Sequence, residues 1–256
     1  MKDRGFPNEI EQVLRKIPQK QADYFRDYFR NAPSNVLQAL SLEMRKADRV
    51  LVEENEPIEK VYVLLDGKVK AMDYRVKGTV YEFACFDAVM VFGAMECLFD
   101  VDHYMATLIS KTPCVLVSAP RSVFEKWILS DLHALRMENV NMRRYLLDYS
   151  RESRMMMLLD GTERLIYLLS KQCGAQGYKD EYMLAINRQV LAEQSGTSVK
   201  TINRSMKKLE ETGFLLRVGH KVKIAQNQYA LMRESLGLIL GSDGNKDMWA
   251  CSNTGK

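Results

Sequence analysis

The sequence lacks the residue patterns on which most enzymes and metalloproteins depend. Its five cysteines and three histidines are scattered singly, so none form a CxxC pair or a Cys/His cluster with zinc-site spacing. It also contains no glycine-rich phosphate loop, no nucleophile elbow and no metalloprotease helix. We therefore expect no metal ion, no cofactor and no enzymatic activity. The cysteines are expected to be reduced and mostly buried, as small hydrophobic side chains.

Long apolar runs are also missing. No uninterrupted apolar stretch is long enough to cross a membrane, and the first residues, MKDRGFPNEIEQ, are too polar for a signal peptide. These absences favour a cytoplasmic protein that has no membrane partner. The 256 residues suffice for one large or two modest domains, and a hydrophobic content of 46% is ample for a packed core.

The stretch 186–213, INRQVLAEQSGTSVKTINRSMKKLEETG, has the pattern of two short helices joined by a tight turn. Asn187 and Ser198 are residue types that cap helix N-termini, because their side-chain oxygens can accept from otherwise unpaired backbone N–H groups. Gly196 between the helices can adopt the positive φ of a sharp turn without a steric penalty. Two helices arranged in this way are typical of a helix-turn-helix.

The second helix has one apolar face and one polar face. Ile202, Met206 and Leu209 recur at i, i+4 and i+7, which predicts a buried stripe. The opposite face carries base-reading side chains, since Arg and Lys pair with guanine, Asn pairs with adenine, and Val can touch a thymine methyl. The expected DNA-contacting residues are Arg188, Thr197, Ser198, Val199, Lys200, Thr201, Asn203, Arg204 and Lys207.

Positive charge is concentrated around this helix. Residues 197–224 contain seven Lys or Arg against two Glu, a net charge of +5, whereas the whole chain has only +4. An ordinary solvated helix is the alternative, and the concentration of charge favours DNA binding over it. We therefore expect double-stranded DNA to be a partner.

The rest of the chain predicts an α+β protein. Residues 1–40 have helical apolar spacing, and from Leu42 short strands alternate with polar turns, which indicates an antiparallel sandwich or roll. After the helix-turn-helix, Phe214–Val218 and Lys221–Ile224 flank Gly219 as a hairpin wing. The predicted strands of the roll are LEMRKA, RVLVEE, KVYVLLDG, KVKAMDY, TVYEFACF, HYMATLIS and CVLVSA.

A long helix is predicted from Asp131 to Leu159, where apolar residues recur every seven positions. A sustained heptad stripe indicates a coiled-coil seam, and a single DNA-reading helix usually needs a two-fold partner one DNA turn away. The alternative is that the helix packs on its own domain. We expect a homodimer on a palindromic operator, with an interface at Leu135, Met142, Tyr149 and Met156.

These features together resemble the CRP/FNR family of transcription regulators over about Leu42–Ile224. The strand pair ENEPIEKVYVLLDGKVK is similar to the family's G-E-x(5)-Y-x(4)-G signature at Glu56, Tyr62 and Gly67. Gly93 matches the glycine that opens the family's ligand-binding cassette. LLDGTERLIYLL is similar to the family hinge and the helix after it, and SVKTINRSMKKLEETGFL to the recognition helix.

The resemblance implies an N-terminal β-roll of the cupin or jelly-roll kind, a dimerisation helix and a C-terminal winged helix-turn-helix. The expected parts are residues 1–130 for the N-terminal helices and roll and 131–160 for the dimer helix and hinge. Residues 161–226 would form the DNA-binding domain, and 227–256 a helix and tail. The resemblance also implies RNA polymerase as a partner.

Three departures from the family restrict which effector or cofactor the chain can bind. Where cyclic-AMP-binding members carry a ribose-binding Glu and a phosphate-binding Arg-Ser pair, this chain has Ala94 and Tyr104-Met105. Neither Tyr nor Met supplies the charge that a buried phosphate needs, so cyclic nucleotide is not expected. An iron–sulfur cluster is not expected because no cysteine precedes Cys85, and His103 is interpreted as a surface-loop histidine rather than a haem ligand.

The residues expected to line a cavity between the roll and the dimer helix are mainly apolar, and they suit an aromatic or largely apolar small effector. In this respect the chain is similar to the family branch that senses halogenated phenols. The alternatives are a regulator without a ligand and one switched by oxidation of a thiol such as Cys97 or Cys114. An enzyme ranks far below these. The expected effector-binding residues are Gly93, Ala94, Met95, Tyr104, Met105, Leu146 and Tyr149.

The recognition helix also departs from the family at Lys200. Many members place there a Glu that accepts a hydrogen bond from a cytosine amine, and an Arg at the position of Arg204 that takes a guanine. Lysine has three donors and no acceptor, so Lys200 cannot read cytosine in that way. The operator half-site is therefore expected to differ from the family's TGTGA or TTGAT at the base pair opposite Lys200.

Overall fold

The computed structural model describes residues 5–76 and 79–240, with the side chains at 75, 76, 79, 144, 148, 149, 151, 239 and 240 left outside the description. Two compact units emerge, and each is described by itself. The N-terminal unit holds the chain up to Asp73 together with Glu82–Tyr149, and the C-terminal unit holds Tyr74–Tyr81 and the chain from Ser150 onward. The part boundaries expected after residues 130, 160 and 226 stay predictions.

The N-terminal unit opens with short helices, as the apolar spacing of residues 1–40 predicts. Pro18 and Pro33 stand at the N-caps of the second and third helices, where a missing backbone N–H breaks no helical hydrogen bond. The apolar side chains Ile10, Phe25 and Val36 of these helices are buried in one core. The helices are α1 (Asn8–Leu14), α2 (Gln19–Tyr28) and α3 (Ser34–Gln38).

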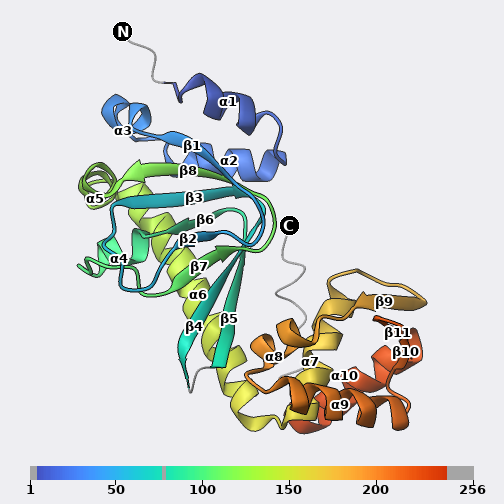
Figure 1. Ribbon diagram of the computed structural model, residues 1–256. Coiled ribbons are helices and arrows are strands. Elements are labelled where there is room, and N and C mark those ends of the chain that lie inside the picture. The colour runs from blue at the N-terminus through green and yellow to red at the C-terminus, as the bar shows by residue number, and fades with distance from the viewer. Residues whose placement is uncertain (1–4, 77–78, 241–256) are drawn as a thin grey trace. The chain divides into compact units, whose positions relative to one another are not determined.

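Two antiparallel four-stranded sheets follow, with strand orders β1-β8-β3-β6 and β2-β7-β4-β5. They confirm the predicted antiparallel roll, and in Figure 1 α1 and α2 run along the sheet that contains β1, β8 and β3. The strands are β1 (Ser41–Arg45), β2 (Val50–Val52), β3 (Lys60–Asp66), β4 (Lys68–Val76), β5 (Thr79–Asp87), β6 (Met90–Phe92), β7 (Thr107–Ser110) and β8 (Cys114–Pro120).

Strand β3 is central in its sheet, and its register fixes the roll. Tyr62 pairs with Ser118 on one side and with Phe92 on the other. The β3–β4 turn depends on Gly67, which has φ +98°, and a Cβ there would lie 2.4 Å from the Pro113 carbonyl oxygen. Only glycine fits this position, which accounts for the glycine of the strand-pair motif.

Three further helices complete the N-terminal unit: α4 (Ala94–Leu98), α5 (Arg121–Ile128) and the start of α6 (Leu132–Leu158). Asp131 fixes the start of α6, because its Oδ1 accepts from the backbone N–H groups of His133 at 3.0 Å and Ala134 at 3.2 Å. Its Oδ2 accepts from Trp127 Nε1 at 3.1 Å, and the Trp127 ring stacks on Phe29 with ring centroids 4.8 Å apart. Asp131 therefore links the start of α6 to the aromatic core.

The C-terminal unit packs helices around a three-stranded sheet with the order β10-β11-β9. Its core takes apolar side chains from the helices and from β9 and β11, among them Leu165, Tyr182, Leu191 and Met232. The wing predicted after the helix-turn-helix is confirmed as the β10–β11 hairpin. The elements are α7 (Gly161–Gly174), β9 (Glu181–Ala185), α8 (Arg188–Ser195), α9 (Val199–Glu211), β10 (Leu216–Val218), β11 (Lys221–Ala225) and α10 (Gln226–Leu240).

Candidate functional site

The first helix of the predicted pair, α8, begins and ends as the sequence predicts. The Asn187 side-chain oxygen accepts hydrogen bonds from Gln189 N at 3.0 Å and Val190 N at 3.2 Å. These bonds satisfy N–H groups that have no partner inside the helix. Gly196 ends the helix in the left-handed conformation with φ +62°. The tight turn into α9 therefore starts at Gly196.

Helix α9 is held by its cap and by its buried stripe. Ser198 Oγ accepts from Thr201 N at 3.1 Å, and Ile202, Met206 and Leu209 are almost wholly inaccessible to solvent. Ser205 is buried on the same side, where its hydroxyl lies 3.1 Å from that of Thr162 on α7. This polar contact is one that apolar periodicity could not reveal. It adds to the packing that fixes the rotation of α9 about its axis.

Fixing α9 in this way turns its long polar side chains outward. Lys200, Asn203, Arg204 and Lys207 are exposed on the side opposite the buried stripe, as expected. Among the described residues, Lys207 has an ion pair with Glu211 at 3.6 Å, and Lys200, Asn203 and Arg204 have no partner. An exposed i, i+4 pair contributes only about 0.3–0.5 kcal/mol, so Lys207 remains available to an anion.

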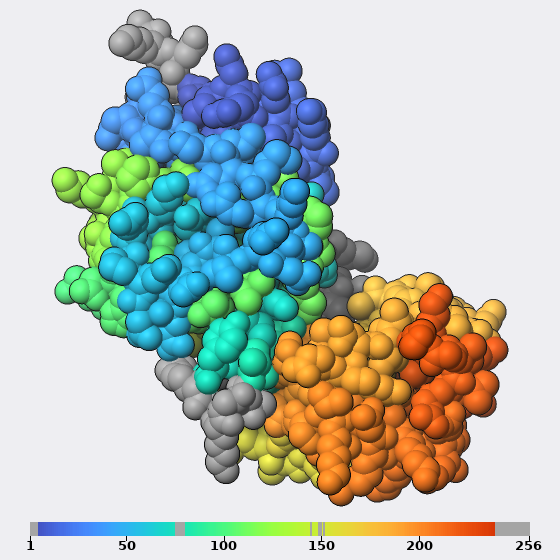
Figure 2. Space-filling model, in the orientation of Figure 1, coloured from blue at the N-terminus to red at the C-terminus, as the bar shows by residue number. Residues whose placement is uncertain are grey.

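The smaller expected contact residues lie around the start of α9. Ser198 is exposed, whereas Thr197, Val199 and Thr201 are half-buried. The Thr197 hydroxyl lies 2.7 Å from Ser195 Oγ, and Val199 packs against the core of the unit. In Figure 2 the orange segments that carry α8 and α9 make up much of the visible surface of the C-terminal unit.

Arg188, at the start of α8, has an unusual environment. Its Nη1 is buried and has no hydrogen-bond partner among the described residues. Burial, and then the charge of Arg217 on the wing, lower the pKa of the Arg188 guanidinium. An unpaired buried N–H beside a second cation is unfavourable until an anion such as a backbone phosphate arrives. Arg217 itself is bound to Glu210, and sequence reasoning did not place it near Arg188.

The cassette residues expected to bind an effector gather around α4. Gly93 is the N-cap of α4 with φ +90°, and a Cβ there would lie 3.3 Å from the Lys60 carbonyl oxygen. Ala94 is fully buried. The buried Tyr104 hydroxyl donates to the Lys60 carbonyl oxygen at 2.6 Å, and burial raises its pKa. This hydroxyl is therefore already engaged in the fold.

Other expected effector residues are less closely gathered. Met95 and Met105 are half-buried, and Leu146 on α6 is 52% exposed. The side chain of Tyr149 lies outside the described residues. Of two cavities in the described chain, one is lined by Tyr24 and residues of the first half of α6 and the other by Asn55, Pro57, Asp102 and His103, so neither is lined by the expected effector residues. The effector cavity between roll and helix thus stays a prediction.

The expected dimer residues occupy different environments along α6. Leu135 and Met142 are half-buried. Met156 is 8% exposed and packs in the core of the C-terminal unit, so its burial does not require a second chain. Exposed apolar side chains elsewhere on α6 include Leu132 at 81% and Leu147 at 51%. The two-fold seam itself stays a prediction.

Three of the thiols in the described part of the chain have the properties of inert core residues. Cys97, Cys114 and Cys173 are buried, and burial raises the pKa of Cys97 to about 11 and that of Cys173 to about 12. Cys85 is exposed, and its pKa is also raised. A thiol with a raised pKa holds little reactive thiolate at neutral pH, which disfavours a redox switch at these positions.

The described residues contain neither a metal-binding cluster nor a membrane-spanning helix. No group of three or more His, Cys, Asp or Glu among the described residues is placed to hold a metal ion. None of the helices within residues 5–76 and 79–240 combines the length and the apolar character required to span a bilayer.

Two family models match the sequence. The cyclic nucleotide-binding domain matches residues 43–131, and the Crp-like helix-turn-helix domain matches residues 163–229, which together make up more than half of the chain. No curated protein matches the chain.

Several solved structures have a similar fold. CLP of Xanthomonas campestris, described as a c-di-GMP-responsive global regulator, is 20% identical with a TM-score of 0.64, covering 73% of this chain and 94% of that chain. A regulator from Eubacterium rectale is 12% identical with a TM-score of 0.65, covering 86% and 97%. A CooA mutant of Carboxydothermus hydrogenoformans is 16% identical with a TM-score of 0.59, covering 80% and 91%.

Proposed function

This chain belongs to the CRP/FNR family of DNA-binding transcription regulators, and from that premise we propose that it acts as a homodimer on a palindromic operator under the control of a small effector. The observation that carries the proposal is the outward face of α9. Lys200, Asn203 and Arg204 are exposed there and have no partner among the described residues. Side chains of these types read base edges in the major groove.

The phosphate backbone would be held by a second set of positive groups. Lys207 on α9 and the half-exposed guanidinium of Arg188 on α8, whose Nη1 has no partner among the described residues, are suited to phosphates rather than bases. Binding a phosphate would also reduce the repulsion between Arg188 and Arg217. We propose that these contacts position α9, and that Arg204, Asn203 and Lys200 supply the sequence preference.

The effector is proposed to be aromatic or largely apolar rather than a cyclic nucleotide. Ala94, Tyr104 and Met105 stand where cyclic-AMP-binding relatives have polar anchors, and the Tyr104 hydroxyl already donates to Lys60. None of these three side chains can neutralise a buried phosphate. Similarity of the roll to the cyclic nucleotide-binding domain therefore supports the fold and a binding role without supporting that ligand.

Control of DNA affinity is proposed to operate at the break between α6 and α7. Helix α6 ends at Leu158, and Asp160 starts α7 with a capping box in which Glu163 accepts from the Asp160 backbone N–H at 2.7 Å. The effector would have to bind the DNA-competent state more tightly than the other state to shift the balance between them. RNA polymerase is the proposed partner of the DNA-bound dimer.

Native mass spectrometry of the protein purified from its own host tests the assembly and the effector together. We expect two subunits per particle and one small molecule retained per subunit, which leaves when the protein is denatured. A particle with one subunit would contradict the dimer. A dimer of apoprotein mass, with an operator affinity that no small molecule in a host extract alters, would contradict effector control while leaving DNA binding in place.

A further inference from the structure

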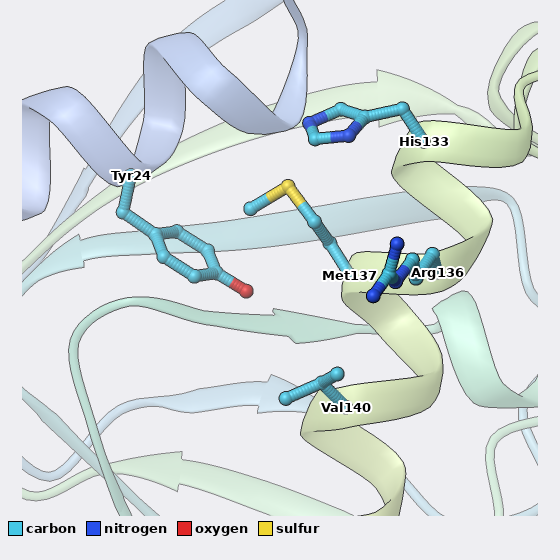
Figure 3. Close-up of a pocket in the computed structure, with 5 residues that line it drawn as sticks. All are labelled: Tyr24, His133, Arg136, Met137 and Val140. Atoms are coloured by element: carbon cyan, nitrogen blue, oxygen red, sulfur yellow. The ribbon is translucent and has the colours of Figure 1, made fainter.

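A groove lies between α2 and the first half of α6, and none of the residues that line it belongs to the cassette around Gly93. Its cavity of about 220 Å³ is lined by Tyr24 of α2 and by His133, Arg136, Met137 and Val140 of α6. Figure 3 shows the Tyr24 ring facing Met137, with Arg136 and Val140 along the α6 side. A single aromatic ring is the right size for this space, since an apolar cavity of about 150 Å³ already holds benzene.

The walls of the groove are mainly apolar, and its charge is positive. The Tyr24 ring, Met137 and Val140 provide carbon surface. Arg136 is exposed and has no ion pair among the described residues. The nearby carboxylate of Asp27 is already shared between Arg30 at 3.2 Å and His133 Nε2 at 3.2 Å. Arg136 therefore remains the uncompensated charge at the groove.

Hydrogen bonds hold the Tyr24 side in place. The Tyr24 hydroxyl donates to Asn141 Oδ1 at 3.0 Å, and its ring stacks on Tyr28 at 6.4 Å between centroids. The Tyr28 hydroxyl donates in turn to the buried Glu138 carboxyl at 3.1 Å. A ring fixed at both its hydroxyl and its face forms a preorganised wall, which lowers the entropy lost when a ligand binds.

We propose that this groove binds a small aromatic carboxylate, with its ring between Tyr24, Met137 and Val140 and its carboxylate on Arg136. A guanidinium offers paired N–H donors that match a carboxylate, and apolar walls favour a ring over a bare anion. The expected dimer seam does not compete for the groove. At 3.6 residues per turn, Leu135 and Met142 point to another side of α6 than Arg136 and Val140.

The site goes beyond the proposed function, because it does not depend on DNA binding or on the cassette. Fluorine NMR of the full chain with para-fluorobenzoate is the direct test, and the uncharged para-fluorobenzamide is the comparison. We expect a saturable shift for the benzoate and an affinity at least about tenfold weaker for the amide, because the amide lacks the charge that pairs with Arg136. No saturable shift, or equal affinities for the two compounds, would overturn the proposal.

Variants locate the bound ligand. Arg136→Gln should weaken para-fluorobenzoate about tenfold or more, and Val140→Trp should abolish binding by filling the cavity. Arg143→Gln is the matched control, because Arg143 is an exposed arginine two turns further along α6 that does not line the cavity. If Arg136→Gln folds, as circular dichroism would show, and binds as tightly as Arg143→Gln, the site is not the one described.

Discussion

Replacing Glu138 with Gln should remove a pH dependence of stability that is built into the packing of α2 on α6. The Glu138 side chain is 1% exposed and accepts hydrogen bonds from Tyr28 Oη at 3.1 Å and Asn141 Nδ2 at 3.5 Å. Burial raises its pKa from 4.5 to about 7, Glu96 adds to the rise, and the two hydrogen bonds oppose it. The folded protein therefore holds a proton that the unfolded chain releases.

The direction in which stability changes with pH follows from the state that holds this proton, which is the folded protein. Below pH 4.5 both states are protonated at Glu138 and its contribution to stability is complete, and this contribution is lost as pH rises toward 7. A rise of the pKa from 4.5 to about 7 corresponds to about 3 kcal/mol. Gln cannot ionise, so the stability of Glu138→Gln relative to the natural protein should increase by about 3 kcal/mol between pH 4.5 and pH 8.

Urea unfolding followed by Trp127 fluorescence measures this difference, because Trp127 is buried in the same aromatic core at 5.8 Å from the Tyr28 ring. Glu9→Gln, at an exposed carboxylate on α1, is the control and should keep the natural pH profile. If Glu138→Gln and the natural protein lose stability in parallel from pH 4.5 to 8, Glu138 is not the buried acid that the packing implies.

Three further predictions concern assembly, ligand and DNA. Met142→Glu should place like charges across the expected seam at a cost of several kcal/mol, giving a monomer in sedimentation that no longer binds its operator; a stable dimer would exclude this seam. Cyclic AMP should alter neither melting temperature nor DNA affinity, and a micromolar affinity, about −8 kcal/mol, would show that the cassette alignment around Ala94 is wrong. In fluorescence anisotropy Arg204→Ala should cost ~1–3 kcal/mol and relax one operator position, whereas Lys207→Ala should weaken all sequences alike and lower the salt slope by about 1. Identical losses for the two variants on specific and random DNA would contradict their separate roles.

Local patterns were enough to predict the helix-turn-helix. Caps such as Asn187 and Ser198 act on the next three residues, and the apolar stripe of α9 repeats within one helix, so both can be read from neighbouring positions. The long helix was predicted over 131–159 and is observed as Leu132–Leu158 for the same reason. Strand β6, Met90–Phe92, was missed because three residues are too few for a period and their strand depends on pairing with β3.

Contacts between distant segments could not be predicted. Glu138 lies in a helix rich in charged residues, and only the arrival of α2 with Tyr28 makes it a buried acid. Arg136 likewise resembles any exposed helical arginine until Tyr24 closes the other side of the groove. The approach of Arg217 to Arg188 depends on how the wing folds against α8. Each of these three environments arises only when segments far apart in the sequence pack together.

Randomised-site selection on the natural protein and on Lys200→Ala shows directly whether α9 reads DNA bases through its exposed face. We expect a palindrome with half-sites about one helical turn apart. Each half-site should depart from TGTGA or TTGAT at the base pair opposite Lys200, and Lys200→Ala should lose the preference at that position. Recovery of an unmodified family half-site by both proteins would contradict the role of Lys200, and the absence of any enriched sequence would contradict base reading by α9.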